Sequence, residues 1–73
     1  MERFGEKLRV LREKHGLSYR QLADELEVVH SHLVRIEAGT RVPSLDLAMR
    51  IAAYFKVSLD ELLWDDRELK TKT

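Results

Sequence analysis

Hydrophobic residues recur at helical spacing in five short segments of the chain. Phe4, Leu8 and Leu11 lie at positions i, i+4 and i+7, which predicts a first helix from about residue 2 to residue 15. Later segments have the same period, and their apolar positions are Leu22, Ala23, Leu26, Leu33, Ile36, Leu45, Ala48, Ile51, Ala52 and Phe55. A last short helix continues to Trp64. The pattern therefore predicts an all-α fold of five short helices around one core.

Helix start signals separate these segments. Serines that can act as N-caps precede three of the predicted helices, and they are Ser18, Ser44 and Ser58. Gln21 and Glu61 follow two of them at the spacing of a capping box. No linker or repeat interrupts the pattern, so we predict one domain over residues 1–64 and a frayed C-terminal tail over residues 65–73.

The second and third predicted helices are joined by only three residues, Glu27 to Val29, which is typical of a helix-turn-helix. Leu33 and Ile36 anchor the second of these helices from one side. The opposite side carries His30, Ser31, Val34 and Arg35. A helix exposed in this way can enter the DNA major groove, which is about 12 Å wide and displays a distinct pattern on each base pair. Val34 is unusual on an outward side, where it either contacts a sugar or a thymine methyl group or marks the surface for a protein partner.

Composition excludes several other classes of protein. The chain has no cysteine, so a disulfide framework, a thiolate metal site and a cysteine nucleophile are excluded. The N-terminus carries Glu2 and Glu6 and lacks the apolar region of a secretory signal, and the uncharged runs are too short to cross a bilayer. We therefore expect a cytoplasmic protein with no membrane partner.

The formal net charge of zero argues mildly against nucleic-acid binding, because domains that bind nucleic acid tend to be basic. The charge is unevenly distributed, however. The first twenty residues carry six basic and three acidic side chains, whereas the segment 21–42 carries two basic and four acidic ones. The basic run of the first helix, which comprises Arg3, Lys7, Arg9, Arg12 and Lys14, is either a nucleic-acid stripe or, as we favour, mostly a solvated face. This balance predicts a modest and strongly salt-sensitive affinity for DNA.

Candidate metal and catalytic residues have simpler explanations. His30 and His32 lie two positions apart on a predicted helix and so point in different directions, which makes a shared metal ion with His15 improbable. The carboxylate pair at residues 60–61 is explained by helix capping, and the pair at 65–66 by a solvated helix end. We therefore predict no enzymatic activity, no metal or other cofactor, and no small-molecule substrate.

Several short motifs occur in order and at fixed spacing along most of the chain. They are Leu8-Arg9-Val10-Leu11-Arg12, Gly16-Leu17-Ser18, Leu22-Ala23-Asp24-Glu25-Leu26, Leu33-Val34-Arg35-Ile36-Glu37-Ala38-Gly39, Pro43-Ser44, Ala52 and Val57-Ser58-Leu59-Asp60-Glu61-Leu62. With them the sequence resembles the Cro and phage-repressor type of helix-turn-helix protein, the lambda-repressor-like family. The resemblance implies a sequence-specific transcriptional regulator of the repressor or controller type, which binds a palindromic operator in double-stranded DNA as a homodimer.

The resemblance also implies roles for single residues. Base reading falls on Val29, His30, Ser31 and Arg35, with Val29 placed to meet a thymine methyl group. Phosphate contacts fall on Tyr19, Thr40 and Arg41. An ion pair between Arg12 and Glu37 is implied as well, and it would orient the recognition helix.

Three apolar residues near the end of the chain have no predicted place in the core. They are Leu59, Leu63 and Trp64. An exposed apolar patch usually marks an interface, and family members often dimerise through their last helix. We therefore predict a homodimer interface at these residues.

The chain also departs from the family pattern. Glu27 stands where family members commonly have a glycine with positive φ, and Val29 stands where they have a serine or threonine N-cap. Tyr19 replaces a usual glutamine, and Lys56 a usual glycine. Glu27 and Val29, together with the outward-facing Val34, favour an alternative, in which the chain is a protein-interaction module or antitoxin-like adaptor that keeps the fold and binds DNA weakly or not at all.

Overall fold

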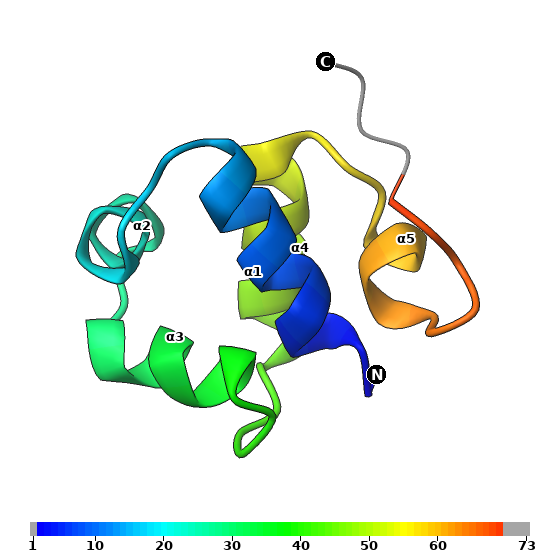
Figure 1. Cartoon of the computed structure of the whole chain (residues 1–73), viewed down its shortest axis with the longest axis horizontal. Coiled ribbons are helices and arrows are strands. Elements are labelled where there is room, and N and C mark those ends of the chain that lie inside the picture. The colour runs from blue at the N-terminus through cyan, green and yellow to red at the C-terminus, as the bar shows by residue number, and fades with distance from the viewer. Residues whose placement is uncertain (1, 70–73) are drawn as a thin grey trace.

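Five α-helices make up the part of the chain that the computed structural model describes, residues 2–69. They are α1 (Phe4–Lys14), α2 (Tyr19–Leu26), α3 (His30–Glu37), α4 (Leu45–Phe55) and α5 (Leu59–Leu63), as Figure 1 shows. No strand occurs among these residues, so the predicted all-α fold of five helices is confirmed. No helix in this part of the chain has the length and apolar character needed to cross a membrane.

Serine side chains cap the N-terminal ends of three of the helices. The amide of Gln21 donates to Ser18 Oγ at 3.1 Å, and the amide of Ser18 donates to Gln21 Oε1 at 2.8 Å. Ser58 and Glu61 make the same reciprocal pair, with both bonds at 3.0 Å. Ser44 Oγ accepts one amide hydrogen bond at the start of α4. Both predicted capping boxes are therefore formed, and they satisfy amide groups that a helix start leaves without a partner.

The first four helices end at a residue in the left-handed conformation. These residues are Gly16, Glu27, Gly39 and Lys56, with φ between 57° and 81°. In each case two amide groups bond back to carbonyl oxygens of the last turn, in the pattern of a Schellman motif. An ordinary L-residue in this conformation costs about 1–2 kcal/mol, so Glu27 and Lys56 carry a strain that the two glycines avoid.

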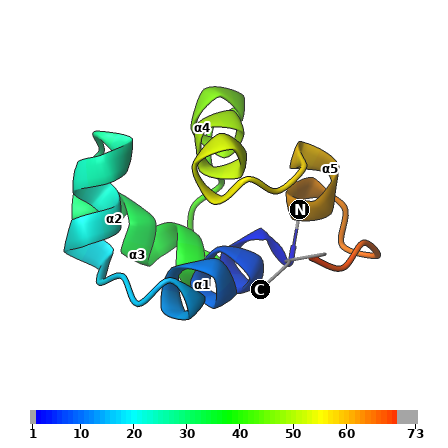
Figure 2. The same cartoon turned by 90° about the horizontal axis from the view of Figure 1, so that it is seen from above.

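The helices enclose one core. Figures 1 and 2 show α1 and α4 on opposite sides of the molecule, α2 and α3 at one end, and α5 at the other. One predicted core position is wrong: Leu45 is 63% exposed, and Leu47 is buried instead. As the first residue of α4, Leu45 lies on the outward side with Met49, whereas Leu47 shares the inward side with Ile51.

Helix α1 crosses α3 closely at Gly5. A Cβ atom at this position would lie 2.3 Å from the carbonyl oxygen of Ile36 and 2.9 Å from that of Glu37. Both atoms belong to the backbone of the last turn of α3, so they cannot move aside cheaply. Glycine lowers helix propensity by about 1 kcal/mol relative to alanine, but here it allows the contact that places the end of α3 against α1.

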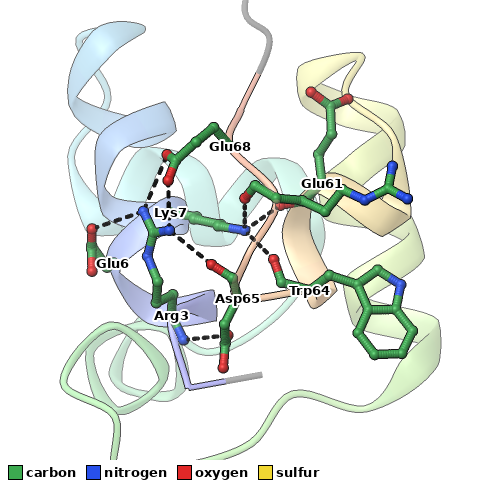
Figure 3. Close-up of polar contacts among 8 residues, drawn as sticks. Arg3, Glu6, Lys7, Glu61, Trp64, Asp65 and Glu68 are labelled. Carbon is green, nitrogen blue, oxygen red and sulfur yellow. Dashed lines mark hydrogen bonds and ion pairs between the residues drawn. The ribbon is translucent and has the colours of Figure 1, made fainter.

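Lys7 joins α1 to the C-terminal end of the described chain. Its side chain is only 2% exposed. Its ammonium group donates to the carbonyl oxygens of Glu61 at 2.5 Å, Trp64 at 2.7 Å and Arg67 at 2.5 Å (Figure 3). All three ammonium hydrogens are thus used, and they satisfy carbonyl groups at and beyond the end of α5.

Arg3 makes a second connection to the same segment. Its guanidinium donates to the backbone oxygen of Asp65 at 2.9 Å and to a carboxylate oxygen of Glu68 at 2.8 Å (Figure 3). The Asp65 carboxylate accepts the backbone amides of Arg3 and Glu2, which lowers the pKa of Asp65 below its usual value. Hydrogen bonding to Arg3 likewise lowers the pKa of Glu68. Part of the tail predicted to fray therefore makes contacts in the structure, since Asp65, Arg67 and Glu68 bond to residues at the start of the chain. Residues 70–73 of that tail lie outside the described residues.

The basic run of α1 is therefore not one solvated face. Lys7 is buried, and Arg3 and Arg12 are held in hydrogen bonds to distant parts of the chain. Arg9 fits the expectation, since it is exposed and pairs with Glu13 at 3.3 Å. The expectation of a solvated side chain is wrong for Lys7, because its long flexible side chain lets the ammonium group reach carbonyl groups at and beyond the end of α5.

Candidate nucleic-acid interface

The turn between α2 and α3 fixes how these two helices meet. Glu27 takes the left-handed conformation with φ of 58°, and the amide of Val28 donates to the carbonyl oxygen of Ala23 at 3.0 Å. Val28 packs partly buried against the core. From α4, Arg50 donates to the carbonyl oxygen of Leu26 at 2.5 Å, which satisfies one of the free carbonyl groups at the end of α2. The arrangement is a helix-turn-helix, with its second helix along one edge of the molecule (Figure 1).

Helix α3 is buried on one side only. Leu33 and Ile36 lie in the core with almost no exposure. The side predicted to point outward is exposed in the structure, and its residues are His30, Ser31, Val34 and Arg35. The helix therefore presents a row of exposed side chains, of which Val34, at 38% exposure, is covered over most of its surface.

The N-terminal end of α3 has no side-chain cap. Val29 precedes the helix in an extended conformation and is 68% exposed, and its side chain has no group that could accept a hydrogen bond. In α2, α4 and α5 a serine occupies this place. The amides of His30 and Ser31 thus have no side-chain cap, and the partial positive charge of a helix start favours an anion such as phosphate there.

The arginines of the first four helices and their loops fall into two groups. Four of them pair with carboxylates, and these are Arg3, Arg9, Arg12 and Arg50. The other three are Arg20, Arg35 and Arg41, which are exposed and make no side-chain hydrogen bond or ion pair within residues 2–69. They lie at the start of α2, on α3 and in the loop after α3. Among the arginines of the first four helices and their loops, those without an internal partner within residues 2–69 therefore belong to the helix-turn-helix and the loop that follows it.

The ion pair expected between Arg12 and Glu37 is present. Two guanidinium nitrogens of Arg12 lie 2.8 and 3.2 Å from the two carboxylate oxygens of Glu37, and a third donates to the carbonyl oxygen of Leu17 at 2.9 Å. Hydrogen bonding to Glu37 raises the pKa of Arg12 above its ordinary value. Tyr19 stacks on the same guanidinium, which lies 4.1 Å from the ring centre. Arg12 thus links α1, the last turn of α3 and the first residue of α2, and it holds the ring of Tyr19 in place.

Thr40 and Arg41 follow α3 directly. The amide and the hydroxyl of Thr40 both donate to the carbonyl oxygen of Arg35, at 3.0 and 3.1 Å. Thr40 therefore closes the end of α3 and fixes the backbone beside Arg41. Arg41 is among the residues that line a cavity of about 300 Å³, together with Phe4 and Pro43.

Acidic side chains lie close to these groups in the sequence. Asp24 and Glu25 on α2 and Glu27 in the turn are all exposed. Because carboxylates oppose the approach of a phosphate backbone, they lower the net attraction that the three arginines provide.

The predicted dimer residues differ in exposure. Leu59 and Leu63 are partly buried and pack against the core. Trp64 is 59% exposed, and its indole ring points away from the Lys7 ammonium (Figure 3). Trp64 is therefore the one of the three that offers most of its side chain to a partner.

The histidines are not arranged as a metal site in the part of the chain that the structure describes. His15 Nδ1 lies 2.9 Å from the carbonyl oxygen of Leu11, and its ring meets the ring of Phe55 edge to face at 4.9 Å. Across residues 2–69, no three His, Cys, Asp or Glu side chains are placed to hold a metal ion.

Sequence reasoning missed the structural roles of three residues: Gly5 and Arg50, which contact the helix-turn-helix, and Lys7, which holds the segment at and after α5. Lys7 carries a signal in its spacing, because it stands inside the apolar stripe of α1, three residues after Phe4 and four before Leu11. Gly5 and Arg50 carry no local signal, because their contacts lie far away in the chain. The backbone that Gly5 contacts is 31 to 32 residues away, and the carbonyl group to which Arg50 donates is 24 residues away.

Comparison with known proteins gives concordant results. A protein-family model described as helix-turn-helix matches residues 8–62. The chain is 36% identical over 63 residues to an uncharacterized HTH-type transcriptional regulator of Methanocaldococcus jannaschii. This match covers 85% of this chain and 96% of that protein. It is 44% identical over 57 residues to a putative HTH-type transcriptional regulatory protein of Thermococcus kodakarensis, of which the match spans only 18%.

A solved structure has the same architecture. The N-terminal DNA binding domain of SinR from Bacillus subtilis superposes with a TM-score of 0.82, covers 93% of this chain and 100% of that one, and is 28% identical in sequence. The same overall fold is thus common to two chains that differ at most positions.

Proposed function

This chain belongs to the helix-turn-helix family of the Cro and lambda-repressor type, and from that premise we propose that it is a DNA-binding transcriptional regulator of the repressor or controller type. It binds a palindromic operator in double-stranded DNA as a homodimer, and it acts by binding and not by catalysis. The relatives that are named as transcriptional regulators and the DNA binding domain of SinR support the general function.

The single observation that carries the proposal is the uncovered side of α3 with its unpaired arginine. Arg35 is exposed, has no carboxylate partner within residues 2–69, and can make a bidentate contact to guanine in the major groove. His30 and Ser31 lie on the same side of the helix and can bond purine edges, and Val29 can meet a thymine methyl group.

Phosphate contacts hold α3 in its register on the duplex. Arg41 supplies a free guanidinium, and Tyr19 supplies a hydroxyl on a ring that Arg12 holds by stacking. Thr40 lies between the end of α3 and Arg41 and presents its side chain on the same loop. Such contacts fix orientation without reading sequence, and they make binding depend steeply on salt.

A homodimer forms through the C-terminal end of the domain. Trp64 is the exposed anchor, with Leu59 and Leu63 beside it on α5. A two-fold pair of domains sets two recognition helices about 34 Å apart, which matches the two half-sites of a palindrome. The test is the molecular mass in light scattering at tens of micromolar: the parent is expected as a dimer and Trp64→Arg as a monomer, and a parent that is monomeric contradicts the dimer.

The function is tested by selecting duplexes from a random-sequence pool and measuring binding by fluorescence anisotropy at 50 and 200 mM salt. We expect the selected duplex to bind, with an affinity that falls by orders of magnitude between about 50 and 200 mM salt. Arg35→Ala is expected to lose about 1–3 kcal/mol on the selected duplex and to relax its sequence preference, while Arg41→Ala weakens all duplexes similarly.

Arg9→Ala is the matched control. Arg9 is an exposed arginine on α1 that pairs with Glu13, so its removal is expected to leave DNA binding unchanged. Absence of any enriched duplex at 50 mM salt contradicts the proposed function. Equal binding of Arg35→Ala and the parent contradicts the choice of reading residue.

A second function is supported by the turn and by the start of α3. Glu27 brings a carboxylate and Val29 an uncapped apolar side chain to the surface that would face DNA. Both features suit a protein-interaction module or antitoxin-like adaptor better than a tight DNA binder. A stable heteromeric partner in a pull-down, together with no DNA binding at low salt, would favour this alternative.

A further inference from the structure

Helix α3 carries an apolar side chain in the middle of its exposed side. Val34 is 38% exposed, and it lies four residues after His30 and three after Ser31, so the three share one side of the helix. Arg35 is the next residue along the chain. Each of these neighbours can form hydrogen bonds, whereas Val34 has no polar side-chain atom.

The fold does not need Val34 at this place. Leu33 and Ile36 fill the core from α3, and both are almost fully buried. Single exposed apolar residues are common on protein surfaces. The position of Val34 is what distinguishes it, because a side chain among three potential base-reading residues enters the groove whenever they do.

The chemistry of the major groove offers one apolar group to such a side chain. Thymine presents its C5-methyl group there, next to the hydrogen-bonding edges of the other bases. Valine is branched at Cβ and holds almost one χ1 rotamer in a helix, so its two methyl groups keep a fixed direction. A rigid apolar side chain flanked by polar ones is therefore suited to a methyl group that lies between polar base edges.

We propose that Val34 is a further specificity-determining residue, which contacts the C5-methyl group of a thymine in each half-site of the operator. The proposal rests on the proposed DNA-binding function and adds to it the kind of base that the centre of α3 selects. It differs from the contact implied for Val29, which lies before the helix and five residues away along the chain.

The test replaces the thymines of the selected duplex one at a time by deoxyuridine. Uracil lacks only the methyl group and keeps the same hydrogen-bonding atoms, so any loss reports the methyl contact alone. For the parent protein we expect about fourfold weaker binding at the thymine that Val34 contacts in each half-site, the equivalent of about 0.8 kcal/mol for one buried methylene-sized group. In Val34→Ala this penalty is expected to disappear at that thymine.

Two variants keep the result interpretable. Alanine has a higher helix propensity than valine, so Val34→Ala is expected to fold, which far-UV circular dichroism checks. Val29→Ser is the matched control, because it removes the other exposed valine of this surface and should leave the uracil penalty at the Val34 thymine unchanged.

The outcomes separate this proposal from the function on which it rests. A duplex that is enriched and bound, yet insensitive to uracil at every thymine, overturns the role of Val34 and leaves DNA binding intact. If every uracil penalty of the parent persists in Val34→Ala, the methyl contacts belong to other residues and the proposal is overturned as well. If no duplex is enriched at 50 mM salt, the proposed function fails and this inference fails with it.

Discussion

Replacement of Lys7 by methionine tests how the C-terminal end of the domain is held. Methionine has a flexible apolar side chain that fills a similar space, so the change removes the ammonium group with little loss of packing. In the native protein this group makes three hydrogen bonds to backbone carbonyl oxygens, at 2.5 to 2.7 Å. The variant leaves those three carbonyl groups without their donor.

The size of the effect follows from two opposing terms. Each charge-assisted hydrogen bond contributes about 1.5–3 kcal/mol, and the three bonds share one charge, so their contributions do not add in full. Removal of a buried charge also recovers a desolvation penalty of several kcal/mol. We therefore expect a net loss of about 2–4 kcal/mol, which is a large part of the total of roughly 4–11 kcal/mol for a chain of this length.

Urea denaturation followed by far-UV circular dichroism measures the loss as a lower midpoint at an unchanged slope. Hydrogen exchange shows where it arises, because the amides of Trp64 and Arg67 bond within the segment that Lys7 holds. Their protection should fall more than that of core amides in α4. Lys14→Met is the matched control, since Lys14 is an exposed lysine of the same helix and its replacement should change stability by less than about 0.5 kcal/mol. A loss below about 1 kcal/mol for Lys7→Met, or unchanged protection of both amides, refutes the reasoning.

Three further predictions concern other contacts of the fold. Gly5→Ala is expected to destabilise the domain by about 1–3 kcal/mol in urea denaturation despite its better helix propensity, because the new Cβ overlaps the backbone of α3; an equal or higher midpoint contradicts this. Lys56→Gly is expected to raise stability by about 0.5–1 kcal/mol, since it relieves a positive φ of 57° at the end of α4; no gain would show that the strain is absorbed elsewhere. The pKa values of Asp65 and Glu68 are lowered by hydrogen bonds that involve Arg3, so their stabilisation is complete above the ordinary carboxyl values and is lost as pH falls through the lowered ones. Hydrogen exchange between pH 6 and pH 3 should therefore show the segment after α5 losing protection as pH falls through these lowered values, and equal protection at both ends of the range contradicts the role of this pair.

The helices and their starts could be predicted from the sequence because their causes are local. An apolar period of 3.6 residues and a serine three residues before Gln21 or Glu61 act within one or two turns of helix. The outward side of α3 follows from the same period, because Leu33 and Ile36 define the inward side. The pairing of Arg12 with Glu37 was available only through resemblance to a family, since nothing near either residue points to the other.

The other features of the fold depend on long-range contacts. The sequence did not predict these contacts, because they join groups that are far apart in the chain. The sequence alone suggested that the charges of α1 are solvated, whereas the fold buries Lys7 against carbonyl groups 54 to 60 residues away. Glycine at position 5 lowers the helix propensity of α1, whereas the fold uses the missing side chain to bring two helices together. Local pattern thus determined which segments are helices and which side of each is apolar. Only the tertiary structure decided which charges are free to meet DNA, because a charge is free or paired according to neighbours that the local sequence does not contain.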